Sequence, residues 1–236
     1  MALAQVSSTT QFTSLPGVQF GGSGNPNSAV QVTTITDGSD VITLGLAAQQ
    51  RGNNPALAND GAGTYFATPG ANNGGFSSLI GSKWNFDFYA NVNSPRTADI
   101  ALGGYSFALF YEFDPAKGTT PNGAINLNLF NDGSGPKTFS NTTVQNSENL
   151  NFGFLASGVA GVVTPPSSGP ATFDPNALGE YTFDLVAYDS AGDQIGDSKI
   201  NVDVVPDAAS TALLLGLTLG GLGAFSRLNQ RRSVMA

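Results

Sequence analysis

Residues 179–188 read Gly179-Glu180-Tyr181-Thr182-Phe183-Asp184-Leu185-Val186-Ala187-Tyr188 and alternate apolar with more polar positions. The run from Lys199 to Val205 repeats this pattern with Ile200, Val202 and Val204. Period-two alternation is typical of a strand with one buried face. The polar segment between the two runs, Asp189-Ser190-Ala191-Gly192-Asp193, has the composition of a turn. We therefore predict an antiparallel hairpin here.

Strand-like alternation recurs upstream of this hairpin. The segments that show it are Val30 to Ile35, Val41 to Leu46, Trp84 to Tyr89, Tyr105 to Asp114, Ile125 to Phe130 and Leu150 to Phe154. No segment upstream of Pro206 has helical periodicity over three turns, whereas Gly and Pro are frequent, with 30 and 13 residues. We predict an all-β fold, a single antiparallel β-sandwich of immunoglobulin-like or jelly-roll-like type over residues 5–204. The Gly- and Asn-rich region from Gln50 to Ser78 is predicted to be a long loop.

The C-terminal region, residues 205–236, has a different character. Val205-Pro206-Asp207 precedes an uncharged stretch from Ala208 to Ser226, and three arginines follow, Arg227, Arg231 and Arg232. At about 1.5 Å per helical residue, residues 208–226 span roughly 28 Å, close to the ~30 Å of a bilayer's hydrocarbon core. We predict one transmembrane helix over residues 208–226, and the arginines place its C-terminal end in the cytoplasm.

This order of motif, apolar span and arginine cluster resembles the PEP-CTERM class of bacterial sorting signals, most closely its VPDSG variety. Val205, Pro206 and Asp207 match that motif, whereas Ala208 and Ala209 replace its Ser-Gly. The resemblance implies export, recognition by an exosortase-type membrane protease and cleavage near the motif. It also implies a producer that makes extracellular polysaccharide. The predicted hairpin from Gly179 to Gly192 separately resembles the last hairpin of immunoglobulin-like and PKD-like modules.

The first residues of the chain contain only one feature of a signal peptide. Residues 1–4 include Ala2-Leu3-Ala4, which has the small-x-small form of a signal peptidase site, but no basic or long apolar region precedes it. We interpret residues 1–4 as the remnant of a signal peptide.

Composition excludes several kinds of chemistry. The chain has neither His nor Cys, so Ser-His-Asp triads, Cys nucleophiles and Cys/His zinc sites are excluded. Residues 1–207 hold six Lys/Arg and all seventeen Asp/Glu, and the net charge of the whole chain is −8. Such an acidic body argues against nucleic acid as a partner.

The remaining candidate catalytic and metal sites therefore consist of Asp and Glu side chains. Glu112 and Asp114 share one strand face and could form the carboxylate pair of a glycosidase, or they could be a solvated strand end. Asp189, Asp193 and Asp197 gather at one turn and could bind Ca²⁺, although Asp is also favoured in turns for its own hydrogen bonds.

Two functions follow from the sequence. The first is a non-enzymatic envelope or extracellular-matrix protein, sorted through its C-terminus and associated with exopolysaccharide, with no cofactor except the possible calcium ion. The alternative is a secreted carbohydrate-active enzyme that uses a carboxylate pair. We favour the first, because the carboxylates of this sequence form no catalytic pattern that differs from those of ordinary turns and strands.

Overall fold

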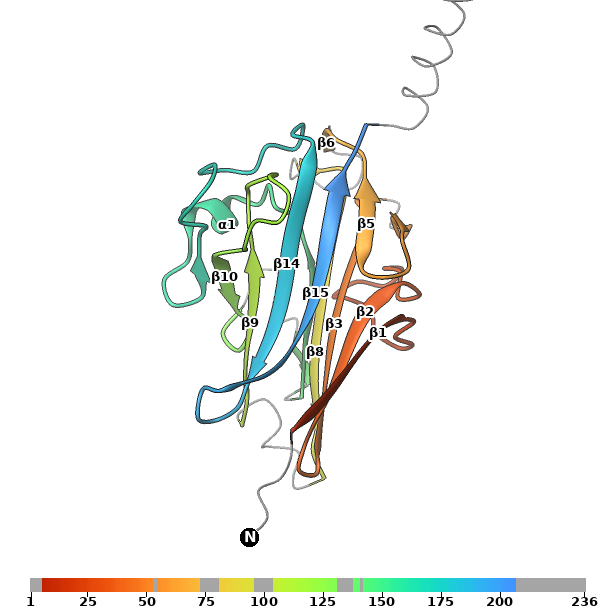
Figure 1. Ribbon diagram of the computed structural model, residues 1–236, viewed down its shortest axis with the longest axis vertical. Coiled ribbons are helices and arrows are strands. Elements are labelled where there is room, and N and C mark those ends of the chain that lie inside the picture. Colours follow the sequence, from red (N-terminus) through yellow and green to blue (C-terminus); the bar gives the residue numbers. More distant parts are fainter. Residues whose placement is uncertain are drawn as a thin grey trace, which may run out of the picture.

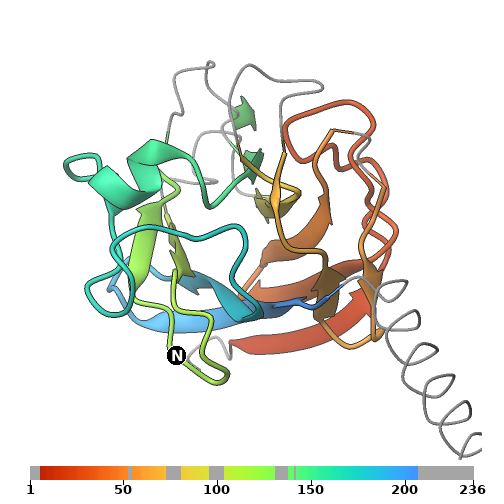
Figure 2. The same ribbon diagram turned by 90° about the horizontal axis from the view of Figure 1, so that it is seen from above.

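The chain folds into two main β-sheets that face each other. The computed structural model describes residues 6–52, 55–72, 81–95, 104–130, 138–140 and 142–206. Figure 1 shows the long strands running along the longest axis of the molecule, and Figure 2, from above, shows the two layers end-on. The protein is thus mostly β and sandwich-like, as the alternation predicts.

The first sheet has six strands, all paired antiparallel. Its spatial order is β1 (Ser7–Thr13), β2 (Val30–Asp37), β3 (Asp40–Gln50), β8 (Trp84–Asn93), β12 (Thr143–Glu148) and β11 (Thr138–Ser140). The long pairing of β3 with β8, from Val41 opposite Asn93 to Gln50 opposite Trp84, forms its centre.

The second sheet has seven strands, and the predicted C-terminal hairpin lies near its middle. Its order is β13 (Val163–Thr164), β10 (Gly123–Asn126), β9 (Ser106–Tyr111), β14 (Gly179–Tyr188), β15 (Gln194–Val204), β5 (Thr64–Ala67) and β4 (Ala58–Asn59). β15 pairs antiparallel with β14 and parallel with β5. The expectation of purely antiparallel sheets is therefore wrong at this one pairing. A separate pair joins β6 (Ala71–Asn72) and β7 (Gly81–Ser82).

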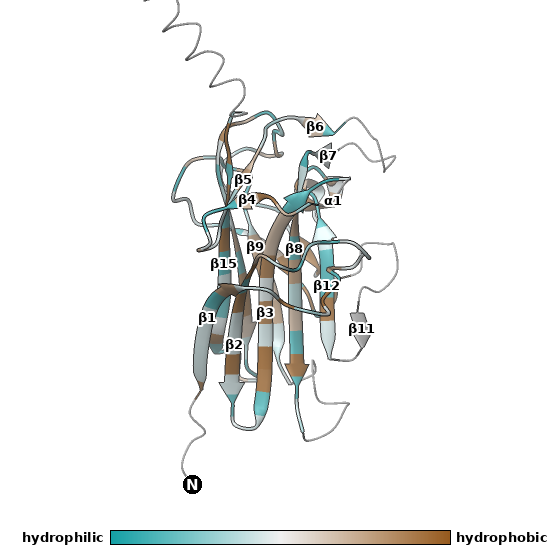
Figure 3. Ribbon diagram, turned by 90° about the vertical axis from the view of Figure 1, so that its right-hand side faces the viewer, coloured by the Kyte–Doolittle hydropathy of each residue, from teal (hydrophilic) through white to brown (hydrophobic). Residues whose placement is uncertain are grey.

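Aromatic side chains fill the space between the sheets. Phe86 of β8 stacks on Phe183 of β14 with 4.6 Å between ring centroids. Trp84, on the same face of β8, meets Phe183 edge-on at 6.2 Å and Tyr181 at 5.9 Å. All four side chains are buried. Figure 3 shows the alternation that causes this, with hydrophilic and hydrophobic bands along β3 and β8.

The expected strands at Val30–Ile35, Val41–Leu46, Trp84–Tyr89 and within Tyr105–Asp114 are confirmed, as is the hairpin. The predicted strand from Leu150 to Phe154 is wrong, because α1 (Gly153–Ser157) stands there. Asn149 starts the turn before it: its side-chain oxygen accepts from Asn151 N at 3.1 Å, and its carbonyl accepts from Phe152 N at 2.9 Å.

The long loop predicted from Gln50 to Ser78 is also wrong in part. It contains β4, β5 and β6, and β5 completes the pairing of β15. The Gly and Asn residues here form tight turns between short strands. These strands are too short for an alternation of apolar and polar residues to be visible in the sequence.

Several expectations fall on residues outside the described part of the chain. These are the signal-peptide remnant at residues 1–4, Asp207 of the sorting motif, the transmembrane helix at 208–226 and the arginine cluster. Among the residues that the structure does describe, no helix is both long and apolar enough to cross a bilayer.

The packing predicts a large effect for Phe183. Replacing Phe183 with Ala should lower the free energy of unfolding by about 3–5 kcal/mol, because the change leaves a cavity between the sheets. Chemical denaturation of the purified protein measures this. The matched control is Leu129→Ala, since Leu129 is 61 % exposed and should cost little. Equal effects of both changes would contradict the assigned core.

Candidate functional site

The structure brings Glu112 and Asp114 together at one pocket. Both follow β9, and the pocket has a volume of about 370 Å³. Its other lining residues carry hydroxyl or amide groups: Thr119, Thr120, Asn122 and Ser168. The sequence-based pairing of the two carboxylates is thus realised as neighbours in one pocket, which we call the carboxylate pocket.

Both carboxylates already accept hydrogen bonds from the protein. Glu112 is 2 % exposed, and its Oε1 accepts from the backbone N–H of Thr182 at 2.9 Å, while its Oε2 accepts from the Thr119 hydroxyl. Asp114 Oδ1 accepts from Ala116 N at 2.9 Å. Glu112 is therefore buried, whereas Asp114, where a solvated strand end is expected, is half-buried. These bonds hold the segment after β9 against β14, a structural task for the pair.

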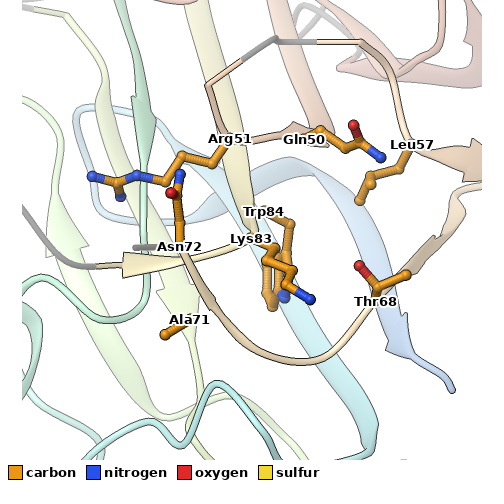
Figure 4. A pocket seen from close by; sticks show the side chains of 8 residues that line it. All are labelled: Gln50, Arg51, Leu57, Thr68, Ala71, Asn72, Lys83 and Trp84. Atoms are coloured by element: carbon orange, nitrogen blue, oxygen red, sulfur yellow. The ribbon is translucent and has the colours of Figure 1, made fainter. Parts of the chain in front are cut away.

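A second pocket lies where β3 ends and β8 begins. It has a volume of about 340 Å³ and is lined by Gln50, Arg51, Leu57, Thr68, Ala71, Asn72, Lys83 and Trp84. Figure 4 shows their side chains, with the Lys83 ammonium and the indole nitrogen of Trp84 on the same side and the Thr68 hydroxyl facing them. We call it the Lys83 pocket.

Backbone hydrogen bonds place Lys83 at this pocket. The Lys83 carbonyl accepts from Arg51 N at 2.8 Å, and Lys83 N donates to the Gly70 carbonyl at 3.1 Å. Gly70 has a φ of +119°, a conformation that side-chain-bearing residues rarely adopt. A Cβ at Gly70 would also lie 2.9 Å from the Lys83 side chain. The bare backbone at Gly70 therefore gives the Lys83 stem its room.

Trp84 is fixed from two sides. Its carbonyl accepts from Asn149 Nδ2 and from Ser82 Oγ, each at 2.7 Å. Its ring packs in the core against Phe173, Tyr181 and Phe183. Trp84 is 1 % exposed, and within the described part of the chain its Nε1–H has no hydrogen-bond partner. An unpaired buried donor costs stability unless something accepts from it.

The charge at the Lys83 pocket is positive although the chain is acidic. None of the described residues that line it is Asp or Glu. Arg51 contributes its stem, while its guanidinium lies 5.1 Å from the Phe152 ring centroid. Burial lowers the pKa of that guanidinium, and the charge of Glu148 opposes the shift. Lys83 thus supplies the charge that faces the pocket.

Of the aspartates considered for calcium, Asp189 and Asp193 lie on the β14–β15 connection and Asp197 lies within β15. This connection is at the opposite end of the sandwich from the Lys83 pocket (Figure 1). Asp189 Oδ1 accepts from Ala191 N and from Asp193 N, each at 2.9 Å, and Asp197 Oδ1 accepts from Gln194 Nε2 at 3.2 Å. Among the described residues, no three acidic side chains gather closely enough to hold a metal ion. The hydrogen bonds within the turn are a sufficient reason for an aspartate at position 189. The calcium site therefore stays a prediction, which this geometry does not favour.

Comparison with protein-family models, with curated proteins and with solved structures gave no match. The chemistry of the two pockets therefore follows only from the residues that line them.

Sequence reasoning missed the Lys83 pocket. Gln50, Thr68 and Asn72 lie in or at the edge of the predicted loop, and the alternation from Trp84 to Tyr89 predicts only a strand for Trp84. The usable signal was the pair Lys83-Trp84, a cation beside the chain's one Trp at a strand start.

Asp184 gives the outer face of the second sheet a pH-dependent stability. Burial and, to a smaller extent, the charge of Asp197 raise the pKa of its carboxyl to about 6, against the opposing charge of Lys199. Its Oδ1 is buried without a partner among the described residues. Since the folded pKa exceeds the unfolded value of about 3.9, folding disfavours the charged form above pH 6.

Asp184→Asn should therefore raise the free energy of unfolding by about 1 kcal/mol at pH 8, a value reduced for the partial exposure of the carboxyl. The gain should shrink as the pH falls from about 6 to about 4. Denaturation at several pH values measures it, with the exposed Asp193→Asn as control. A gain that does not change with pH would contradict the assigned shift.

Proposed function

We propose that the protein is an exported, non-enzymatic β-sandwich domain that is sorted to the cell envelope through residues 205–236. The observation that carries this proposal is the direct passage from an internal strand into the sorting motif. β15 ends at Val204, and Val205 N still donates to the Ala67 carbonyl at 2.9 Å. No further element stands between the sandwich and Pro206.

The short connection supports a role as a tethered domain. Three residues, 205–207, separate β15 from the predicted membrane span. At about 3.5 Å per extended residue they reach roughly 10 Å, so the span would hold this end of the sandwich beside the membrane. Processing by an exosortase-type protease near Val205-Pro206-Asp207 would release the domain to the surface or the surrounding polysaccharide.

The sorting proposal predicts where a reporter goes. Fusing residues 205–236 to an exported reporter should move it to the envelope fraction in a host that contains an exosortase. Changing Arg227, Arg231 and Arg232 to Gln should impair retention or processing, because the cytoplasmic charges are lost. Fractionation and immunoblotting measure both. A reporter that stays fully soluble in the periplasm would sink the proposal.

A carbohydrate-active enzyme is the second candidate, favoured by the shared pocket of Glu112 and Asp114. We expect no turnover, because Glu112 is held by Thr182 N and the Thr119 hydroxyl and is not free to exchange a proton with a substrate. The measurement is release of reducing ends from the producer's exopolysaccharide. Hydrolysis that disappears in both Glu112→Gln and Asp114→Asn, but not in Asp193→Asn, would establish the enzyme instead.

A further inference from the structure

We propose that the Lys83 pocket binds a carboxylate-bearing sugar, such as a uronic acid residue of an acidic polysaccharide. The inference rests on the proposed function in one respect, namely that export brings the domain to such polymers. The pocket itself is argued from its own residues.

The charge of the pocket selects an anion. Lys83 is exposed at its rim, and no described carboxylate forms an ion pair with it. The chain as a whole carries −8, yet none of the described residues that line this pocket is Asp or Glu. An exposed ammonium at a pocket of polar side chains can form a charge-assisted hydrogen bond with a carboxylate.

The remaining groups select hydroxyl and carboxylate oxygens. The buried Nε1–H of Trp84 can only donate and has no hydrogen-bond partner among the described residues, so a ligand oxygen that reached it on binding would satisfy it. In Figure 4 this nitrogen points toward the side of the pocket where the Lys83 ammonium and the Thr68 hydroxyl lie. The amides of Gln50 and Asn72 can both donate and accept, which suits sugar hydroxyls.

The size of the pocket fits a small polar unit. Its volume of about 340 Å³ lies at the low end of small-molecule sites, about 300–1,000 Å³. Leu57 and Ala71, on opposite sides of the pocket in Figure 4, add apolar surface against which the carbons of a sugar ring can pack. It lies on residues of β3, β6 and β8 and shares none with the carboxylate pocket.

The chain offers its own reporter for this site. Trp84 is the sole tryptophan, so its fluorescence reports on the pocket directly. The test is a titration of the full chain, in a non-ionic detergent, with trigalacturonate, the methyl ester of trigalacturonate and inorganic phosphate, each confirmed by calorimetry. We expect a saturable change in Trp84 emission with trigalacturonate, and much weaker binding of the uncharged ester and of phosphate.

Variants identify the residue responsible. Lys83→Gln should weaken trigalacturonate binding by about tenfold, because it removes the charge-assisted contact, and Lys83→Arg should restore most of the affinity. The matched control is Lys117→Gln, which makes the same change in net charge at a side chain that is 84 % exposed and outside the pocket.

Three results would overturn the proposal: no saturable binding of trigalacturonate, equal losses in Lys83→Gln and Lys117→Gln, or phosphate binding as tightly as the sugar acid. Each of these three results is obtained with the purified protein alone. Failure here would leave the localisation of the tail reporter unchanged, so the two proposals fail separately.

Discussion

The contact on which this fold depends is the aromatic packing between β8 and β14. Phe86 stacks on Phe183, and Trp84 meets Phe183 edge-on. Such pairs add about 0.5–1.5 kcal/mol each beyond the burial of their area. The chain has no Cys, so no disulfide supplements this core. Because β8 and β14 lie inside their sheets, the cluster couples the two layers through their strands of longest register.

The same cluster connects the fold with the proposed site. Trp84 belongs to the core by its ring and to the Lys83 pocket by its Nε1–H. Asn149 and Ser82 hold its backbone, so the floor of the pocket is rigid while Lys83 stands exposed at the rim. A floor that is already held in place lowers the ordering cost of binding a small oxygen-rich ligand. Both pockets lie at the end of the sandwich where β15 finishes, because their lining residues include the end of β3, the start of β8 and the segment after β9.

Local alternation made the long strands predictable, since Phe183, Leu185 and Val202 repeat every second residue and are buried. Alternation did not predict the strands that form mainly because a neighbouring strand pairs with them. β1 reads Ser7–Thr13 with almost no apolar residue, and β12 carries buried Gln145 and Asn146, so neither shows the pattern. The carboxylate neighbours Glu112 and Asp114 were predictable because they lie two residues apart, directly after β9. The Lys83 pocket was not, because it joins residues 50, 68 and 83, which only the fold brings together.

Trp84 is packed in the core with the Lys83 pocket above it, and its fluorescence tests this burial most directly. The folded protein should show blue-shifted Trp84 emission that acrylamide quenches weakly. Chemical unfolding should shift the emission to the red and make quenching efficient in the same cooperative transition. Red-shifted emission that acrylamide quenches freely in the folded protein would contradict both the core and the site built on it.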